Sequence, residues 1–423
     1  MVSIADGGSR GVVGGPFGSK LGRRDYVEGG VPVIRGVNLP TSSRFAEHDF
    51  VFVTEEKVRE DLGGNLAQPG DIIVTQRGTI GQVGLIPRIG SRFERYVISQ
   101  SQMRFRADLS RVSPEFVFYA LRSPHTTRRL QDLAISAGVP HINLEMFRSF
   151  ELDVPDLSCQ RKIAAVLSAY DESIENNVRR IEILEEMAQA VYREWFVNFR
   201  YPGLEGVELV DSPLGPIPQG WRAGSFRDIA ESKRRLFDPS KAQGELVDHY
   251  SFAAFDAGET PVREFADTML SGKLLIEQPA ILLAKLNPRI PRVWYARPTI
   301  ERRAVASSEF LVLEGTGDAS LEFVHAVCTY PDFQAQLTAM SGGTSTSHQR
   351  LKLEDLMNRP LVVPSGAAVH SYEEVSGPMH DLVANLTSQN ANLRATRDLL
   401  LPRLVSGEID VSDLDIDTDW LVA

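Results

Sequence analysis

The sequence is poor in cysteine: it has two in 423 residues, Cys159 and Cys328, in different halves of the chain. Neither is accompanied by other ligands at metal-site spacing, which argues against a disulfide framework and a structural metal centre. No apolar run approaches the roughly 18 residues of a membrane span. Asp6, Arg10 and many glycines interrupt the N-terminus, which lacks the pattern of a signal peptide. We expect a reduced, cytoplasmic protein with no membrane partner.

Catalytic signatures are missing too. The chain has no Gly-rich phosphate loop ending in Lys-Ser/Thr, no nucleophile elbow and no His-Glu-x-x-His. Asn287–Ile290 only faintly resembles the Asn-Pro-Pro-aromatic motif of amino-methyltransferases, because the second proline and the aromatic residue are absent. We interpret it as a turn. The eight histidines form no ligand-spaced cluster. The sequence thus predicts no catalysis, metal or cofactor of its own.

An excess of positive charge is also lacking, since the formal net charge is −11. Taken alone, this argues against a nucleic-acid partner. The acidity is uneven: residues 1–157 hold 19 Lys+Arg and 18 Asp+Glu, whereas residues 368–423 hold 3 and 10. Much of it lies in a C-terminal tail that we expect to be solvated. DNA binding stays compatible with this distribution, although the chain alone would be a poor electrostatic clamp.

What the chain does have is a duplicated helical pattern. In two segments, apolar residues alternate steps of four and three, the period of a two-stranded coiled-coil seam. The first seam is Ile163, Leu167, Tyr170, Ile174, Asn177, Ile181, Leu184, Ala188, Val191 and Trp195. The second is Val375, Met379, Leu382, Leu386, Gln389, Leu393, Thr396, Leu400 and Arg403. The seams predict long helices over about 160–196 and about 371–404, with Asn177 and Gln389 equivalent under a shift of 212 residues.

Each predicted helix follows a β-rich segment broken by glycine and proline, and the landmarks of the two segments recur in the same order. The matched pairs are residues 68–74 with 278–284, Glu115–Val117 with Glu322–Val324, and Leu152–Pro155 with Leu361–Pro364. In the first half, Phe150–Pro155 is typical of a closing edge strand. The ordered matches indicate a domain duplication.

We therefore predict an α+β protein with two tandem β-rich domains, two long helices and an internal pseudo-two-fold repeat. The expected parts are a first β-rich domain at 1–157, a helix at 158–200, a second β-rich domain at 201–367, a helix at 368–408 and an acidic tail at 409–423. From periodicity alone, a purely structural coiled-coil spacer is an open alternative.

A set of short motifs narrows the choice. The first half contains Gly15–Lys20, Gly30–Leu39, Gly70–Gly81, Ser99–Ser101 and His141–Leu144, and then Val154-Pro155 followed by Gln160–Ile163. The second long helix ends in Leu399–Ile409. In this order, over essentially the whole chain, the motifs resemble the specificity subunit of type I restriction-modification enzymes, with its target-recognition domains.

Two features depart from that pattern. The second half has Leu286–Arg289 where the first has the Arg77–Gly81 turn, so its recognition loop is expected to differ. The first half lacks an opening strand like Trp221–Ala230, which leaves the completeness of its N-terminus open.

The resemblance implies a DNA-reading subunit without catalysis. In that family each target-recognition domain reads one half of a split double-stranded DNA target, and the helices form an antiparallel coiled-coil spacer. Two methyltransferase subunits dock on this spacer, and endonuclease/translocase subunits join the full complex. Partners that complete a positive channel would account for the acidity of this chain. The alternatives are a stand-alone DNA methyltransferase with its own target domains and a coiled-coil scaffold that binds no DNA.

Arg, Lys, Gln, Ser and Asn in loops reach phosphates and base edges, although each one alone is often only a surface charge. The candidate DNA contacts of the first half are Lys20, Arg23, Arg24, Gln76, Arg77, Thr79, His141 and Asn143. Those of the second half are Lys285, Asn287, Arg289, Arg292, Thr344, Ser345, His348 and Arg350. In an antiparallel helix pair, Asn177 and Gln389 would face each other and fix the register, because a slipped register leaves a buried amide poorly paired.

Overall fold

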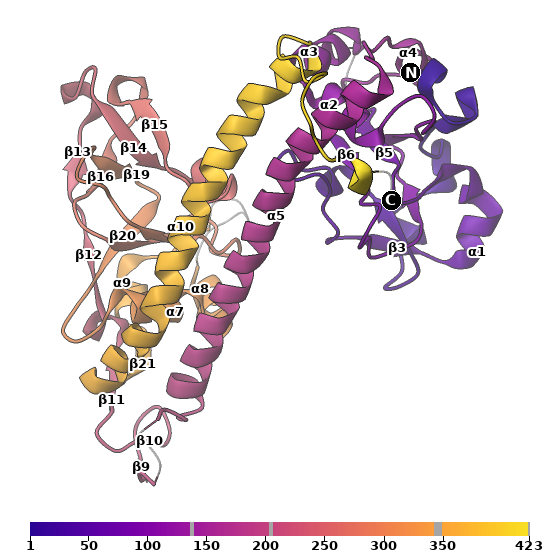
Figure 1. The fold of residues 1–423 in the computed structure, drawn as a ribbon. Coiled ribbons are helices and arrows are strands. Elements are labelled where there is room, and N and C mark those ends of the chain that lie inside the picture. The colour runs from indigo at the N-terminus through magenta and orange to yellow at the C-terminus, as the bar shows by residue number, and fades with distance from the viewer. Residues whose placement is uncertain (136–138, 203–205, 342–348, 422–423) are drawn as a thin grey trace. The chain divides into compact units, whose positions relative to one another are not determined.

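The computed structural model describes residues 1–135, 139–202, 206–341 and 349–421. The chain divides into two compact units. The first is Met1–Asn176 with Asn392–Ala423, and the second is Asn177–Ala391. Each unit contains one β-rich domain and one end of each long helix, α5 (Leu157–Tyr192) and α10 (Gly366–Val405) (Figure 1). Both helices therefore pass from one unit into the other.

The first unit contains two four-stranded sheets. One is antiparallel, in the order β1 (Val12–Gly14), β8 (Gln102–Phe105), β5 (Ile72–Thr75), β6 (Val83–Leu85). The other has the order β3 (Val51–Val53), β2 (Val31–Ile34), β7 (Tyr96–Ile98), β4 (Leu66–Ala67), with β2 and β7 parallel. The helices are α1 (Glu55–Lys57), α2 (Pro114–Arg122), α3 (Pro124–Leu133) and α4 (Leu144–Ser149).

The second unit repeats this arrangement. Its antiparallel sheet has the order β12 (Ala230–Lys233), β20 (Phe310–Gly315), β17 (Ala280–Ala284), β18 (Val293–Ala296). Its mixed sheet has the order β13 (Leu236–Phe237), β16 (Lys273–Ile276), β19 (Ala304–Ala306), β14 (Leu246–Tyr250), β15 (Val262–Phe265), with β14 and β19 parallel. The helices are α6 (Phe252–Asp256), α7 (Leu321–Thr329), α8 (Pro331–Met340) and α9 (Leu353–Met357). The shared strand order confirms the predicted duplication.

The same local signals start the corresponding helices. Ser113 and Ser320 accept hydrogen bonds from backbone N–H groups of the first turns of α2 and α7, as N-cap residues do. Proline opens both α3 and α8, where its missing N–H costs no hydrogen bond. The inner faces then bury Phe116 and Phe323 in the cores of their own units.

One predicted strand of the first half does not form. In the second unit, β21 (Pro360–Val363) pairs with β11 (Arg222–Ser225), after a short hairpin of β9 (Leu209–Val210) and β10 (Ile217–Pro218). Among the described residues of the first unit, Phe150–Pro155 is not a strand and nothing corresponds to β11. Without that partner a strand would leave its ladder groups unpaired. The α-amino group of Met1 instead donates to the carbonyl of Phe150.

Within each unit the two helices run antiparallel, as expected. In the first unit Lys162, early in α5, donates at 2.6 Å to the carbonyl of Ser412, which follows the end of α10, and Asp171 further along meets Arg397 on α10. In the second unit Asn177 meets Asn390, and the hydroxyl of Tyr372 donates to the carbonyl of Ala188 at 3.1 Å. Later residues of α5 thus meet earlier residues of α10.

The predicted register is wrong by one residue. The side-chain amide of Asn177 donates to Oδ1 of Asn390 at 3.0 Å, whereas Gln389 is exposed and bonds to Asn385 on its own helix. The fully buried Tyr372 sets the inner face of α10. Asn390 follows it by eighteen residues, about five turns of 3.6 residues, and so lies on the same side of the helix. The apolar Val375, which the heptad pattern placed in the seam, is 39% exposed.

We expect the Asn177–Asn390 pair to contribute to register more than to stability. Replacing both with leucine should leave the free energy of unfolding unchanged or raise it, whereas Asn177→Leu alone should cost about 1–3 kcal/mol, because the amide of Asn390 is left buried and unpaired. Urea unfolding measures both changes. Gln389→Leu is the control and should change stability by less than about 0.5 kcal/mol. A cost for Gln389→Leu as large as that for Asn177→Leu would contradict this register.

The acidic segment after α10 packs onto the first unit, contrary to the solvated tail that we expected. Val411 is 3% exposed, and Ile409 and Ile416 pack against the first core. These apolar residues are interspersed with the aspartates, so the segment buries one set of side chains while the other stays in water.

Candidate nucleic-acid interface

Three polar segments of the first unit are joined by hydrogen bonds near the end of β5 and the turn that precedes β8. Gln76, at the end of β5, bonds through its backbone N–H to the carbonyl of Ser101 at 2.8 Å and through its side-chain amide to that of Gln100 at 2.6 Å. The amide of Gln100 donates in turn to the carbonyls of Gly18 and Leu21, at 2.6 and 2.9 Å. The loop that carries Lys20 is therefore tied to the end of β5.

The third segment is the loop before α4. The backbone N–H of Gly78 donates to the carbonyl of Pro140 at 3.0 Å, and that of Ile142 donates to the carbonyl of Gln76 at 2.9 Å. Arg77 and His141 form an isolated antiparallel bridge between these two bonds. Gly78 has a φ of +98°, a left-handed value that a glycine adopts without strain. Each of the three segments contains candidate DNA contacts identified from the sequence.

The side chains of these segments have different tasks. Lys20, Arg23, Arg24 and Arg77, which we call the first basic cluster, are exposed, as is Thr79. Gln76 and His141 are half-buried. The side chain of Gln76 takes part in the hydrogen bonds that join the three segments, which we call the frame. Asn143 caps α4, accepting a hydrogen bond from the N–H of Met146 at 2.8 Å. This structural role accounts for Asn143 without DNA, whereas the first basic cluster is presented to solvent.

The second unit builds the same frame with other residues. The backbone N–H of Lys285 donates to the carbonyl of Glu309 at 2.8 Å, and that of Leu351 donates to the carbonyl of Lys285 at 2.9 Å. Asn287 donates to the carbonyl of Gln349 at 2.8 Å, and Leu286 bridges Arg350. Lys285 thus takes the place of Gln76 and Leu351 that of Ile142, both at an offset of 209 residues.

This frame explains the departure seen in the second half. Asn287 has a φ of +54° and makes the same backbone hydrogen bond as Gly78. Asparagine is one of the few residues other than glycine that enter the left-handed region readily. Asn287 therefore corresponds to Gly78, one position away from the offset of 210 residues that relates 68–74 to 278–284. The interpretation of Asn287–Ile290 as a turn is in agreement with this geometry.

The cations of the second half are less free than predicted. Arg292 forms a bidentate ion pair with Asp256, at 2.7 and 2.8 Å, and lies over the ring of Phe252, so its side chain packs within the unit. Arg350 donates to Glu309 at 2.9 Å. Burial lowers the pKa of the half-buried Lys285. Arg289 is exposed, and Thr344, Ser345 and His348 lie outside the described residues.

The sequence-based candidates missed two residues that hold these frames, Gln100 and Glu309. Gln100 lies within the Ser99–Ser101 motif, so the signal was present, but its side-chain bonds to the carbonyls of Gly18 and Leu21 could not be read from spacing. Glu309 contributes its carbonyl to the frame and its carboxylate to Arg350.

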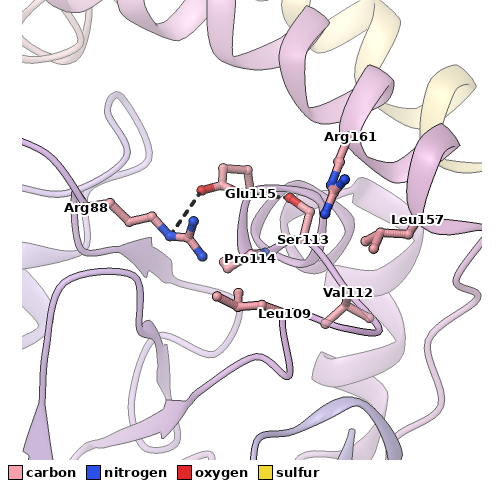
Figure 2. Close-up of a pocket in the computed structure, with 8 residues that line it drawn as sticks. All are labelled: Arg88, Leu109, Val112, Ser113, Pro114, Glu115, Leu157 and Arg161. Carbon is pink, nitrogen blue, oxygen red and sulfur yellow. Dashed lines mark hydrogen bonds and ion pairs between the residues drawn. The ribbon is translucent and has the colours of Figure 1, made fainter. Parts of the chain in front are cut away.

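A small pocket lies at the start of α2 (Figure 2). Arg88 points its guanidinium toward Glu115, 3.9 Å away, and Arg161 approaches from α5. The volume is roughly 60 Å³, which accommodates only a few water molecules. Among the described residues, no three His, Cys, Asp or Glu side chains are grouped as a metal ion would require. In the same part of the chain no helix has both the length and the apolar character to cross a membrane.

Part of the first unit and of α5 matches a known family. Residues 22–186 match the sequence model described as the type I restriction modification DNA specificity domain. The matched segment contains Arg23, Arg24 and Arg77 of the first basic cluster, together with the start of α5. Residues 22–186 are therefore similar to a type I DNA specificity domain.

Similarity to individual proteins extends further along the chain. It is 23% identical over 407 residues to the type I restriction enzyme MjaIX specificity subunit of Methanocaldococcus jannaschii, covering 92% of this chain and 89% of the relative. It is 22% identical over 388 residues to the HindI specificity subunit of Haemophilus influenzae, covering 76% and 83%. The crystal structure of a type I restriction-modification S subunit from M. genitalium has the same fold, with a TM-score of 0.54 and 16% identity over 95% of this chain and 94% of that one. The resemblance to type I specificity subunits inferred from the motifs is confirmed.

Proposed function

We propose that this chain is the DNA-recognition subunit of a type I restriction-modification complex and reads a bipartite, asymmetric target. The observation that carries the proposal is the repeated frame. Each unit holds a strand end and a loop in the same backbone pattern, yet the residues at the equivalent position differ, with the exposed Arg77 in the first unit and the half-buried Leu286 in the second. Two similar frames with different side chains suit two half-sites of different sequence.

In this proposal the chain performs no chemistry, and two methyltransferase subunits dock on the α5–α10 pair. Endonuclease/translocase subunits complete the full complex. The net charge of −11 supports the need for partners, because a chain this acidic gains little from counterion release by itself. The first basic cluster would supply phosphate and base contacts in the first half-site, and Lys285, Arg289 and Arg350 in the second. A coiled-coil scaffold without DNA would not require two such frames.

The test is methylome sequencing of cells that express the chain with an adenine methyltransferase encoded beside it. We expect one methylated motif made of two different short sequences separated by unread bases. Purified chain alone, incubated with DNA and labelled S-adenosylmethionine, should incorporate no methyl group above background. A continuous or palindromic motif would contradict the bipartite target, and incorporation without a partner would contradict the non-catalytic role.

A further inference from the structure

The second unit contains a cavity of roughly 590 Å³ that the proposed function does not use. One wall is α5, and the others come from α7, α8, α10 and the turn after α6. This volume is within the range of sites for small organic ligands. All of its lining residues belong to the second unit.

The lining is strongly acidic. Glu182, Glu185 and Glu186 line it from α5, Glu259 faces them from the turn after α6, and no lysine or arginine is among the lining residues. Spacings of three and four residues place the three α5 carboxylates on one face of the helix. Burial, and then the negative charge of Glu185, raise the pKa of Glu259 to about 8. Carboxyl groups are therefore concentrated here, and no cationic side chain is in the lining.

Unpartnered polar atoms point independently to a ligand. His380 lines the cavity and is only 7% exposed, and its Nε2 has no hydrogen-bond partner among the described residues. Burial lowers its pKa, so the ring is neutral and can accept a hydrogen bond from a ligand. Gln189, also in the lining, donates to the carbonyl of Ala326 at 3.0 Å while its buried Oε1 is unpartnered. Buried polar atoms in native proteins are rarely left unpaired.

The backbone is strained at the same place. Glu259 has a φ of +54° and the preceding Gly258 a φ of +118°. For a glutamate the left-handed conformation is unfavourable, and such strain is concentrated at functional sites. Here it places the carboxylate of Glu259 in the lining opposite α5.

From this geometry we propose that the cavity binds a linear polyamine, an alkyl chain that carries several protonated amines. The α5 carboxylates at positions four residues apart are separated by about 6 Å along the helix axis, which suits cations spaced along a chain. The aromatic rings of Phe255 and Tyr372 line the same space and would cover the methylenes. A single metal ion fits poorly, because no trio of ligands is grouped for one among the described residues. This proposal does not depend on the proposed function.

The first unit provides an internal comparison. Pro124 and Thr127 line a cavity of roughly 530 Å³ there, at the positions that Pro331 and Gln334 hold in the second unit, an offset of 207 residues. Its charged lining residues are Arg122, Arg128, Arg397, Asp171 and Asp398. With three cations and two anions it should repel a polyamine, so we expect one bound molecule per chain.

The experiment is isothermal titration of the full-length chain with spermidine, at low salt and without DNA. We expect saturable binding of one spermidine per chain, and an affinity at least tenfold lower for Glu182→Gln/Glu186→Gln. The matched control is Glu373→Gln/Glu374→Gln, which removes the same charge from an exposed face of α10 outside the cavity and should bind like the natural chain. Circular dichroism checks that both variants are folded.

A second readout distinguishes the site from general attraction to an acidic protein. A bound cation lowers the pKa of Glu259, so binding at pH 8 should release protons, seen as different heats in buffers of different ionisation enthalpy. The proposal is overturned if spermidine gives no binding, if both double variants lose affinity equally, or if magnesium ions bind with the same stoichiometry and affinity. No DNA or methyltransferase takes part, so these outcomes are independent of the proposed function.

Discussion

Replacing Asp171 with asparagine is expected to destabilise the first unit by about 3–5 kcal/mol, because it breaks a buried ion pair and leaves one charge behind. The side chain of Asp171 is 2% exposed and that of its partner Arg397 8%. Asp171 also accepts a hydrogen bond of 2.7 Å from the hydroxyl of Tyr119. Hydrogen exchange of the α2 amides under increasing urea measures the loss in this unit separately.

Two variants act as controls for that result. Asp398 is the other partner of Arg397, and its side chain is 62% exposed. Asp398→Asn should therefore lower the free energy of unfolding by less than about 1 kcal/mol. Asp171→Leu combined with Arg397→Met removes both buried charges and should recover most of the stability. If Asp171→Asn cost no more than Asp398→Asn, the buried pair would not be what stabilises this end of the helices.

Replacing Arg77 with alanine is expected to lower affinity for DNA by about 1–3 kcal/mol, roughly 5- to 150-fold, and only for targets with the correct first half-site. Arg77 is exposed next to the left-handed Gly78, in a loop held by hydrogen bonds on both sides. A side chain on a rigid loop is better suited to contact one base than a charged side chain on a mobile loop. The measurement is binding or methylation of targets altered in one half-site at a time.

Lys20→Ala is the comparison for Arg77→Ala. We expect Lys20 to contact phosphate, so its loss should weaken binding to all sequences similarly and reduce the slope of log affinity against log salt by about 1. If Arg77→Ala also weakened every target equally, Arg77 would be a phosphate contact and the base-reading role would pass to other loop residues.

The duplication could be predicted because strand landmarks and long amphipathic helices recur in the same order in both halves. The helix register could not. A heptad count weighs Val375 and Leu382 as core residues, whereas the buried Tyr372 determines which side of α10 faces inward. Apolar residues of α10 pack either against the β-rich domain or against α5. Periodicity in the sequence does not distinguish these two sets of contacts.

Some of the candidate contacts have structural partners that spacing did not reveal. Arg292 looks like a free loop cation until Asp256 is brought beside it from 36 residues away, a pairing that spacing does not reveal. Asn143 could have been recognised, since an asparagine directly before a short helix is a common N-cap. The missing strand at Phe150–Pro155 required knowing that no partner strand lies beside it.

The left-handed position shared by Gly78 and Asn287 has a consequence for how new targets arise. Because the backbone pattern is the same in both units, substitutions at the exposed Arg77 and Thr79 can change the surface of one unit without refolding it. The other unit, with its own copy of the frame, is left as it was. Under the proposed function, a lineage of such proteins can alter its target one half at a time, provided that glycine or asparagine is kept at the turn.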